Sequence, residues 1–247
     1  MRVPAALLLL LLLLTVVHRS RAQGGQSDGD GHFHGIPVCV TGASGYIASV
    51  LVGQLRDRGY TVVGTTRSPA KYAHQEAFRD VELLPADLAS STSFDEAFSR
   101  CRGGVVFHTA SPFIRKVDNP QEDLVDPAVH GTLNVLRAAK RAMIQRVILT
   151  SSCAAITAGS AKTDHPDKIW SEEDWQLDNT LEHGPYRLSK VRQGGGTGRE
   201  RGSERRGVSL LPCVYVSSLV GIAGCCCCVC VCVCGHLWAS LTAAGHD

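Results

Sequence analysis

The sequence predicts an α/β domain built on a doubly wound parallel sheet, and three observations lead to this prediction. Short β-rich runs alternate five times with segments of helical periodicity, a glycine-rich turn joins the first run to the first helix, and the pattern covers residues 36–191, the length of one domain. Strands that alternate with helices in this way form βαβ units, whose parallel sheet is covered by helices on both faces.

Each strand is expected where a short β-rich run lies between turn signals. The five runs are Pro37–Thr41, Thr61–Thr66, Val81–Leu84, Val105–His108 and Arg146–Thr150. A helix over Tyr46–Arg58 carries apolar residues at helical spacing and stops at Gly59, as at a C-cap. A long helix is expected over Leu124–Ala142, where apolar residues recur at intervals of three or four, and shorter ones near Tyr72–Phe78 and over Ser93–Arg100.

The N-terminal 35 residues are expected to lie outside this domain. An apolar stretch at Ala5–Val17 is shorter than the roughly 20 residues of a spanning helix, and Ser20 and Ala22 fit cleavage after Ala22. Residues 1–22 are therefore interpreted as a signal peptide for the secretory pathway, the endoplasmic reticulum or secretion, with an uncleaved N-terminal anchor as the alternative. If the leader is a gene-model artefact, the protein is cytoplasmic. Residues 23–35 are interpreted as a flexible linker.

The C-terminal segment Arg192–Asp247 is predicted to be a low-complexity tail outside the fold. Val191–Gly207 is rich in glycine and arginine without strand or helix periodicity, and seven of the 11 cysteines lie in Cys225–Cys234. No metal site is expected there, because this spacing lacks the paired Cys-x-x-Cys knuckles of a zinc site. Our hypothesis is a retained intron or a wrong gene model after Lys190, which leaves the sheet incomplete at the C-terminus.

The charge balance excludes one class of partner. The chain has 25 Lys plus Arg against 23 Asp plus Glu and a formal charge of +2. It therefore lacks the strong basic field on which a nucleic-acid binder depends. We expect no nucleic-acid partner, and a membrane partner only if the leader remains as an anchor.

The glycine-rich turn lies where a dinucleotide fingerprint must lie, between the first strand and the first helix. Gly42 would make the turn, Gly45 would let the backbone approach a pyrophosphate, and Ala48 would keep the helix close to the sheet. The unpaired N–H groups at the helix N-terminus would then bind phosphates. The predicted cofactor-binding residues of this turn are Gly42, Ser44, Gly45, Tyr46 and Ile47. The alternative is a tight structural turn without a ligand.

The end of the second strand predicts NADP rather than NAD. NAD binding generally requires an acidic residue there for the ribose hydroxyls, but this chain has Arg67, with Lys71 shortly after it and no acid nearby. Arg67 can bind a 2′-phosphate with two hydrogen bonds, and Lys71 can add a point charge. The alternative is a pair of solvated surface cations.

A tyrosine and a lysine four residues apart are the candidate catalytic pair. If Tyr186 and Lys190 open a helix, they lie on one face, and the ammonium favours the phenolate form of the tyrosine. Ser151 or Ser152 follows the fifth strand, at the sheet edge where open α/β sheets bind their ligands. Taken alone, a Tyr-x-x-x-Lys pattern is usually two exposed helix residues.

Six motifs in this order resemble the extended short-chain dehydrogenase/reductase superfamily, of the NAD-dependent epimerase/dehydratase type. The motifs are TGASGYIA from Thr41, Asp87-Leu88, VFHTASP from Val106, GTLNV from Gly131, LTSS from Leu149 and YRLSK from Tyr186. The chain is most similar to the dihydroflavonol reductase and cinnamoyl-CoA reductase group, over residues 36–191.

The resemblance implies a Rossmann-type fold and specific roles for individual residues. Ser152, Tyr186 and Lys190 would form the catalytic triad, and Arg67 would bind the 2′-phosphate of NADP. The remaining cofactor contacts would come from Asp87 and Leu88, beside the adenine, and from the segment His108 to Ala110, which includes Thr109.

The implied activity is NADP-dependent reduction of a carbonyl to an alcohol, or the reverse reaction, on a small-molecule substrate. Members of the superfamily continue well beyond the Tyr-Lys helix with strands and most of the substrate pocket, and nothing in Arg192–Asp247 resembles that continuation. Two alternatives therefore remain: a sugar-nucleotide epimerase or dehydratase of the same superfamily, and a non-catalytic cofactor-binding remnant.

Overall fold

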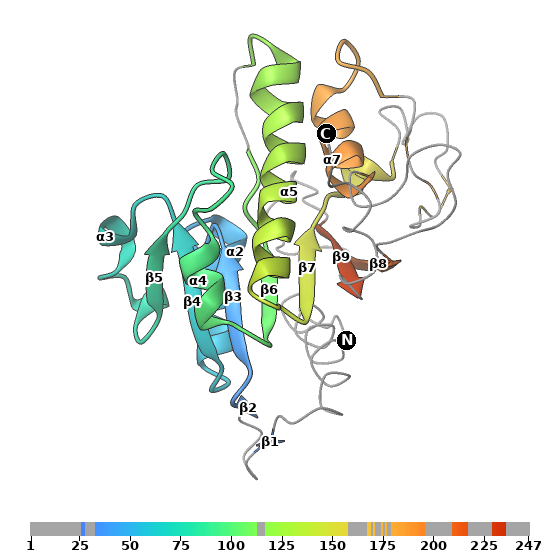
Figure 1. The fold of residues 1–247 in the computed structure, drawn as a ribbon. Helices are drawn as coiled ribbons and strands as arrows, with labels where there is room; N and C mark the ends of the chain where they lie inside the picture. The colour runs from blue at the N-terminus through green and yellow to red at the C-terminus, as the bar shows by residue number, and fades with distance from the viewer. Residues whose placement is uncertain are drawn as a thin grey trace.

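The structure is a computed structural model in which an open sheet carries helices on both faces (Figure 1). The residues that it describes are 26–27, 33–112, 117–157, 167–168, 170, 174, 176, 179–195, 209–216 and 229–235. The predicted signal peptide lies outside the described residues. None of the described helices is long and apolar enough to cross a membrane.

Five parallel strands form the body of the sheet. In chain order they are β3 (Pro37–Thr41), β4 (Thr61–Thr66), β5 (Glu82–Pro85), β6 (Val105–His108) and β7 (Arg146–Thr150). Their spatial order is β5-β4-β3-β6-β7, so that the order reverses between β3 and β6. The predicted doubly wound α/β sheet of Rossmann type is confirmed.

Alternate residues of the strands face two separate cores. Val38 and Val40 of β3 pack against α2 (Tyr46–Arg56), whereas Cys39 between them packs on the opposite face against α4 (Asp95–Arg100) and α5 (Asp126–Arg141). Figure 1 shows α5 along one face of the sheet, with α7 (Pro185–Gly195) beside it. Because both faces of a central strand are buried, its sequence is a continuous apolar run.

The helices predicted over Tyr46–Arg58 and Ser93–Arg100 are each two residues shorter in the structure, as α2 and α4, and the other two predicted helices differ more. Where one helix was expected near Tyr72–Phe78, a four-residue helix α3 (Pro69–Tyr72) is followed by a 3₁₀ turn, η2 (Glu76–Phe78). The long helix is preceded by a π-helical turn, η3 (Gln121–Val125), and α5 itself begins only at Asp126. Proline lacks an N–H group and favours the first helical turn, so Pro127 sets this start.

Three segments of the C-terminal tail are part of the fold, whereas the sequence predicts that Arg192–Asp247 lies outside it. The helix α7 runs past Val191 to Gly195. Strand β9 (Val229–Gly235) pairs antiparallel with β7, and β8 (Ser209–Val216) pairs antiparallel with β9. The physical reason is that β7 would otherwise present an unpaired edge, and the alternating valines of β9 have high strand propensity. The origin of the tail as translated intron stays a prediction.

The predicted linker contains one short element. Strands β1 (Gln26–Ser27) and β2 (Phe33–His34) form an antiparallel pair that is separate from the main sheet. The turn at Gly35 follows, with a φ of +98° that favours glycine.

A disulfide bond joins the centre of the sheet to the helix layer. Cys39 of β3 is bonded to Cys101, which caps the C-terminus of α4, and 62 positions separate them in sequence. Both cysteines are fully buried. A crosslink across so long a loop reduces the conformational entropy of the unfolded chain and thereby stabilises the fold.

Reduction of this bond should lower the free energy of unfolding by about 2–4 kcal/mol. The fold should survive, because the Ala97 carbonyl oxygen lies 3.2 Å from Cys39 Sγ and would accept from a reduced thiol. Urea unfolding with and without reductant tests this for the wild type and Cys101→Ala. Cys153→Ala, which removes a cysteine with a free thiol, is the control and should keep the full effect of the reductant. If the reductant leaves the wild-type midpoint unchanged, the disulfide does not stabilise the protein.

Candidate cofactor-binding and active site

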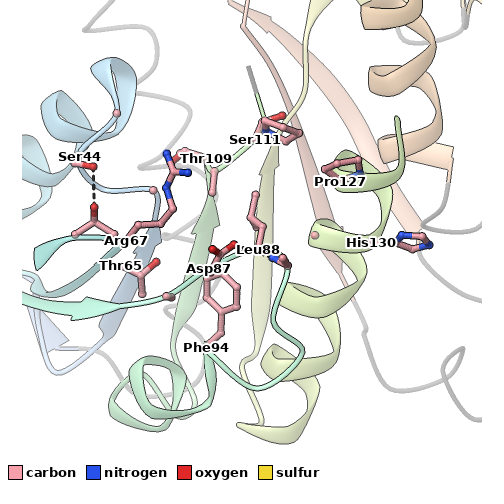
Figure 2. Close-up of a pocket in the computed structure, with 18 of the residues that line it drawn as sticks. Ser44, Thr65, Arg67, Asp87, Leu88, Phe94, Thr109, Ser111, Pro127 and His130 are labelled. Atoms are coloured by element: carbon pink, nitrogen blue, oxygen red, sulfur yellow. Dashed lines mark hydrogen bonds between the residues drawn. The ribbon is translucent and has the colours of Figure 1, made fainter. Parts of the chain in front are cut away.

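A cavity of about 790 Å³ opens at the carboxyl ends of the parallel strands, at the point where the strand order reverses. Figure 2 shows side chains from successive strand ends around it. The segments that line it are Gly42 to Gly45 after β3, Thr65–Arg67 at the end of β4, Ala86–Ala89 after β5, Thr109–Pro112 after β6, and positions of η3 and α5 from Glu122 to Gly131.

The turn after β3 requires glycine for two reasons. Gly42 has a φ of +64°, in the left-handed region, and a Cβ atom there would meet Cα and Cβ of Ala110 at 3.0 Å. Two hydrogen bonds fix the loop, from Gly45 N–H to the Gly42 carbonyl at 2.8 Å and from Ala43 N–H to the Thr65 carbonyl at 2.8 Å. At Gly42 and Gly45 the turn thus presents backbone without a Cβ atom to the cavity.

The helix that follows the turn begins with unpaired donors. Gly45 is the N-cap residue of α2, no side chain caps this end, and its first turn contains no acidic residue. Neither Tyr46, which is 77% exposed, nor Ile47 is among the residues that line the cavity. What these two residues can offer an anion is therefore their backbone N–H groups.

Arg67 lies at the cavity as the sequence predicts, and Lys71 does not. The Arg67 side chain is exposed, lines the cavity, and has no hydrogen-bond or salt-bridge partner among the described residues. Beside it, Ser44 Oγ and Thr66 Oγ1 are 2.9 Å apart, which joins the glycine turn to the end of β4. Lys71 is exposed in α3, outside the cavity lining, with its ammonium 5.5 Å from the centre of the Tyr72 ring.

The predicted adenine contacts, Asp87 and Leu88, line the cavity on a segment that α5 holds in place. The Asn134 amide donates to the Leu88 carbonyl oxygen at 2.9 Å, and a Cβ at Gly131 would meet the Leu88 side chain at 3.0 Å. Asp87 Oδ1 accepts the Ala89 N–H at 2.9 Å. The approach of α5 at Gly131 therefore fixes the position of this wall.

The segment after β6 is bound to the end of β3. The Thr109 hydroxyl donates to the Thr41 carbonyl oxygen, and Ala110 N–H donates to Thr41 Oγ1 at 3.2 Å. Thr109 and Ala110 line the cavity as predicted, whereas His108 is buried within the protein and does not.

The predicted catalytic residues lie on α7 and directly after β7, and none of the three is among the residues that line the cavity. Tyr186 and Lys190 are one turn apart on α7, with the ammonium 5.6 Å from the centre of the Tyr186 ring. Lys190 is almost completely buried, and this burial lowers its pKa to about 8. Its Nζ atom donates to Ser111 Oγ, a residue of the cavity wall, at 2.5 Å. Ser152 follows β7, and its Oγ atom accepts the Ala154 N–H at 3.1 Å.

Sequence reasoning missed two partners of Lys190. One is Ser111, which lies within the quoted VFHTASP motif but had no assigned role. The other is Gln193, whose Oε1 atom accepts from Lys190 at 3.0 Å. The spacing of three residues on one helix was the available signal for Gln193, but it lies in the segment that was interpreted as a tail.

Comparison with known proteins agrees with this geometry. The model of the NAD-dependent epimerase/dehydratase family matches residues 38–193. Cinnamoyl-CoA reductase CAD2 of Medicago truncatula is 48% identical over 149 residues, which are 57% of this chain and 44% of that protein. A bifunctional dihydroflavonol 4-reductase/flavanone 4-reductase of Malus domestica is 36% identical over 146 residues, which are 56% of this chain and 40% of that protein.

A solved structure extends the comparison to three dimensions. The crystal structure of Gre2 from Candida albicans in complex with NADPH has a TM-score of 0.60 at 34% identity, covering 66% of this chain and 52% of that one. The present chain spans less than half the length of the curated relatives named above.

Replacement of Gly42 by alanine should damage both the fold and the site. The positive φ and the contact with Ala110 should lower the free energy of unfolding by about 1–2 kcal/mol and weaken nicotinamide nucleotide binding. The matched control is Gly53→Ala, because a Cβ there meets nothing within 4 Å and α2 should gain about 0.5–1 kcal/mol. Urea unfolding and fluorescence titration with NADPH measure the two effects. Equal behaviour of the two variants would contradict the role given to the Gly42 turn.

Proposed function

Since the chain belongs to the NAD-dependent epimerase/dehydratase family, we propose that it is an NADP-dependent oxidoreductase that reduces a carbonyl to an alcohol, or catalyses the reverse. One observation carries this proposal. A single cavity has the glycine turn and the exposed Arg67 in its lining, together with Ser111, the partner of the buried Lys190. The candidate phosphate-binding groups thus line the cavity, and Lys190 is hydrogen-bonded to its wall through Ser111.

The residues present fit a nicotinamide dinucleotide. The turn at Gly42 leaves the backbone bare, the uncapped N-terminus of α2 offers donors to a pyrophosphate, and Arg67 offers a guanidinium to a 2′-phosphate. Asp87 and Leu88 would border the adenine, across the cavity from the glycine turn. When bound, the nicotinamide supplies the hydride that reduces the substrate carbonyl carbon.

Side chains of this protein would supply the proton that the carbonyl oxygen receives. As the carbonyl carbon accepts the hydride, negative charge develops on its oxygen, and the Tyr186 hydroxyl donates its proton to that oxygen. The Ser152 hydroxyl donates a hydrogen bond to the same oxygen. Loss of this proton converts Tyr186 to a phenolate. The Lys190 ammonium, 5.6 Å from the Tyr186 ring centre, stabilises this phenolate until solvent returns the proton.

The substrate class follows from the relatives and is part of the proposal. Their names include cinnamoyl-CoA reductases, a tetraketide alpha-pyrone reductase and dihydroflavonol reductases. We infer a substrate whose carbonyl belongs to an aromatic thioester, a polyketide or a flavonoid. A panel of these three classes, with NADPH consumption as the readout, tests this inference and also separates a reductase from an epimerase, which would turn over without net consumption of NADPH.

Loss of the Arg67 guanidinium should weaken binding of NADPH and leave that of NADH unchanged. A charge-assisted contact to the 2′-phosphate contributes about 1–3 kcal/mol, so Arg67→Ala should raise the Kd for NADPH roughly 5–150-fold. Arg79→Ala is the control, because Arg79 is also exposed but is paired with Glu76. Titration calorimetry of the wild type and both variants with each nucleotide measures the six Kd values. Equal affinity of the wild type for NADPH and NADH would contradict the proposal.

Removal of the Tyr186 hydroxyl should separate catalysis from binding. Tyr186→Phe removes the proton donor and keeps the ring beside Lys190, so kcat should fall by roughly 10²-fold or more while the Kd for NADPH stays unchanged. Tyr72→Phe, at a tyrosine of α3 outside the cavity lining, is the matched control and should keep full activity. Turnover of Tyr186→Phe near the wild-type rate on a substrate that the wild type reduces would show that another group is the acid.

A further inference from the structure

The amine of Lys190 is held by uncharged oxygen atoms. Its Nζ atom lies 2.5 Å from Ser111 Oγ and 3.0 Å from Gln193 Oε1, and no carboxylate of the described residues forms an ion pair with it. Lys190 is 4% exposed and Gln193 is 2% exposed. Water therefore contributes little to the solvation of the ammonium, and these two acceptors replace it.

The orientation of the Gln193 amide is fixed by the chemistry of its neighbours. An ammonium is only a donor, so the amide must turn its Oε1 atom toward Lys190. Its Nε2 atom then points the other way and donates to Thr132 Oγ1 of α5 at 3.0 Å. A glutamine that is anchored at both ends of its amide cannot change rotamer without losing one of these buried hydrogen bonds.

The chain of hydrogen bonds continues from Thr132 to the glycine turn. Thr132 Oγ1 lies 3.3 Å from His108 Nε2, and His108 Nδ1 lies 2.8 Å from Thr41 Oγ1. Burial, reinforced by the charge of Lys190, lowers the pKa of His108 to about 3, so its ring is neutral and has one donor and one acceptor nitrogen. Thr41 is the residue before Gly42, so this series of hydrogen bonds connects α7, α5, β6 and β3.

We propose that Gln193 is a positioning residue for Lys190. Its amide, anchored through Thr132 and His108, holds the ammonium against Ser111 at the cavity wall and supplies one of the acceptors that keep it charged. The catalytic consequence rests on the proposed function, whereas the positioning itself does not. The proposal also assigns a role to a residue C-terminal to Lys190, within the segment Arg192–Asp247 that the sequence predicts to lie outside the fold.

Substitutions at Gln193 should move the pKa of Lys190 in opposite directions. Gln193→Leu fills nearly the same volume but removes an acceptor of the charged form, so the pKa should fall by about one unit or more. Gln193→Glu places a carboxylate beside the ammonium, so the pKa should rise above that of the wild type. Among the described residues, the other titratable groups that face Lys190 are His108, which is neutral, and Tyr186, and both are unchanged in these variants.

The test is an NMR titration of full-length protein labelled with ¹³C at lysine Cε. The chain has six lysines, and the Lys190 resonance is assigned from its absence in Lys190→Arg. The titration requires neither substrate nor cofactor, so it can fail while the proposed reductase activity holds, and it can succeed while that activity fails. Gln145→Leu, at an exposed glutamine, is the matched control and should titrate as the wild type does.

Two results would overturn the proposal: an unchanged Lys190 pKa in Gln193→Leu, or shifts of the same sign in Gln193→Leu and Gln193→Glu. If Gln193→Leu does not fold, Thr132→Val takes its place, because it frees the Gln193 amide and should lower the Lys190 pKa by a smaller amount. In an active preparation, the pH above which carbonyl reduction declines should move with the Lys190 pKa in each variant. A purely structural role of Gln193 would change stability without this movement.

Discussion

The cavity depends on one close approach, between the turn after β3 and the segment after β6. Gly42 reaches Ala110 so closely that a Cβ would meet it at 3.0 Å, and Thr41 bonds this segment through both its side chain and its carbonyl oxygen. The two strand ends therefore meet where the sheet order reverses, and the space beyond them stays open. Arg67 follows β4, the neighbour of β3, and Asp87 follows β5, the next strand in the sheet, so both line the same cavity.

Several polar groups are buried beside the apolar core, in a network that starts at Thr41, next to this contact. A threonine, a histidine and a glutamine are expensive to remove from water unless each finds a partner. Thr41, His108, Thr132 and Gln193 meet this condition by bonding one another, so the cost is offset within the network. A complete network of this kind specifies one packing of α5 and α7 on the sheet, because a shift of either helix would leave a buried donor unpaired.

Local pattern determined what could be predicted. Four of the five parallel strands have the predicted bounds, since each is a short β-rich run between turn signals. The position of the site could be predicted because the strand ends of a parallel sheet share an edge. The bond between Cys39 and Cys101 was missed, because it depends on how α4 packs on β3 and not on spacing. Gln193 was missed because nothing in a single glutamine signals burial, and β9 because its alternating valines occur within a low-complexity run.

The choice of neutral acceptors around Lys190 has a chemical consequence. A carboxylate in place of the Gln193 amide would pair with the ammonium and hold its pKa high, so that the charge would be fixed across the physiological range. Amide and hydroxyl oxygens solvate the ammonium only in part, and burial then brings its pKa to about 8. In the proposed mechanism, the ammonium is present below pH 8 and would stabilise a Tyr186 phenolate, and above pH 8 this stabilisation would be lost. The uncharged network thus allows one buried lysine to respond to pH within the range in which the proposed tyrosine acid would have to work.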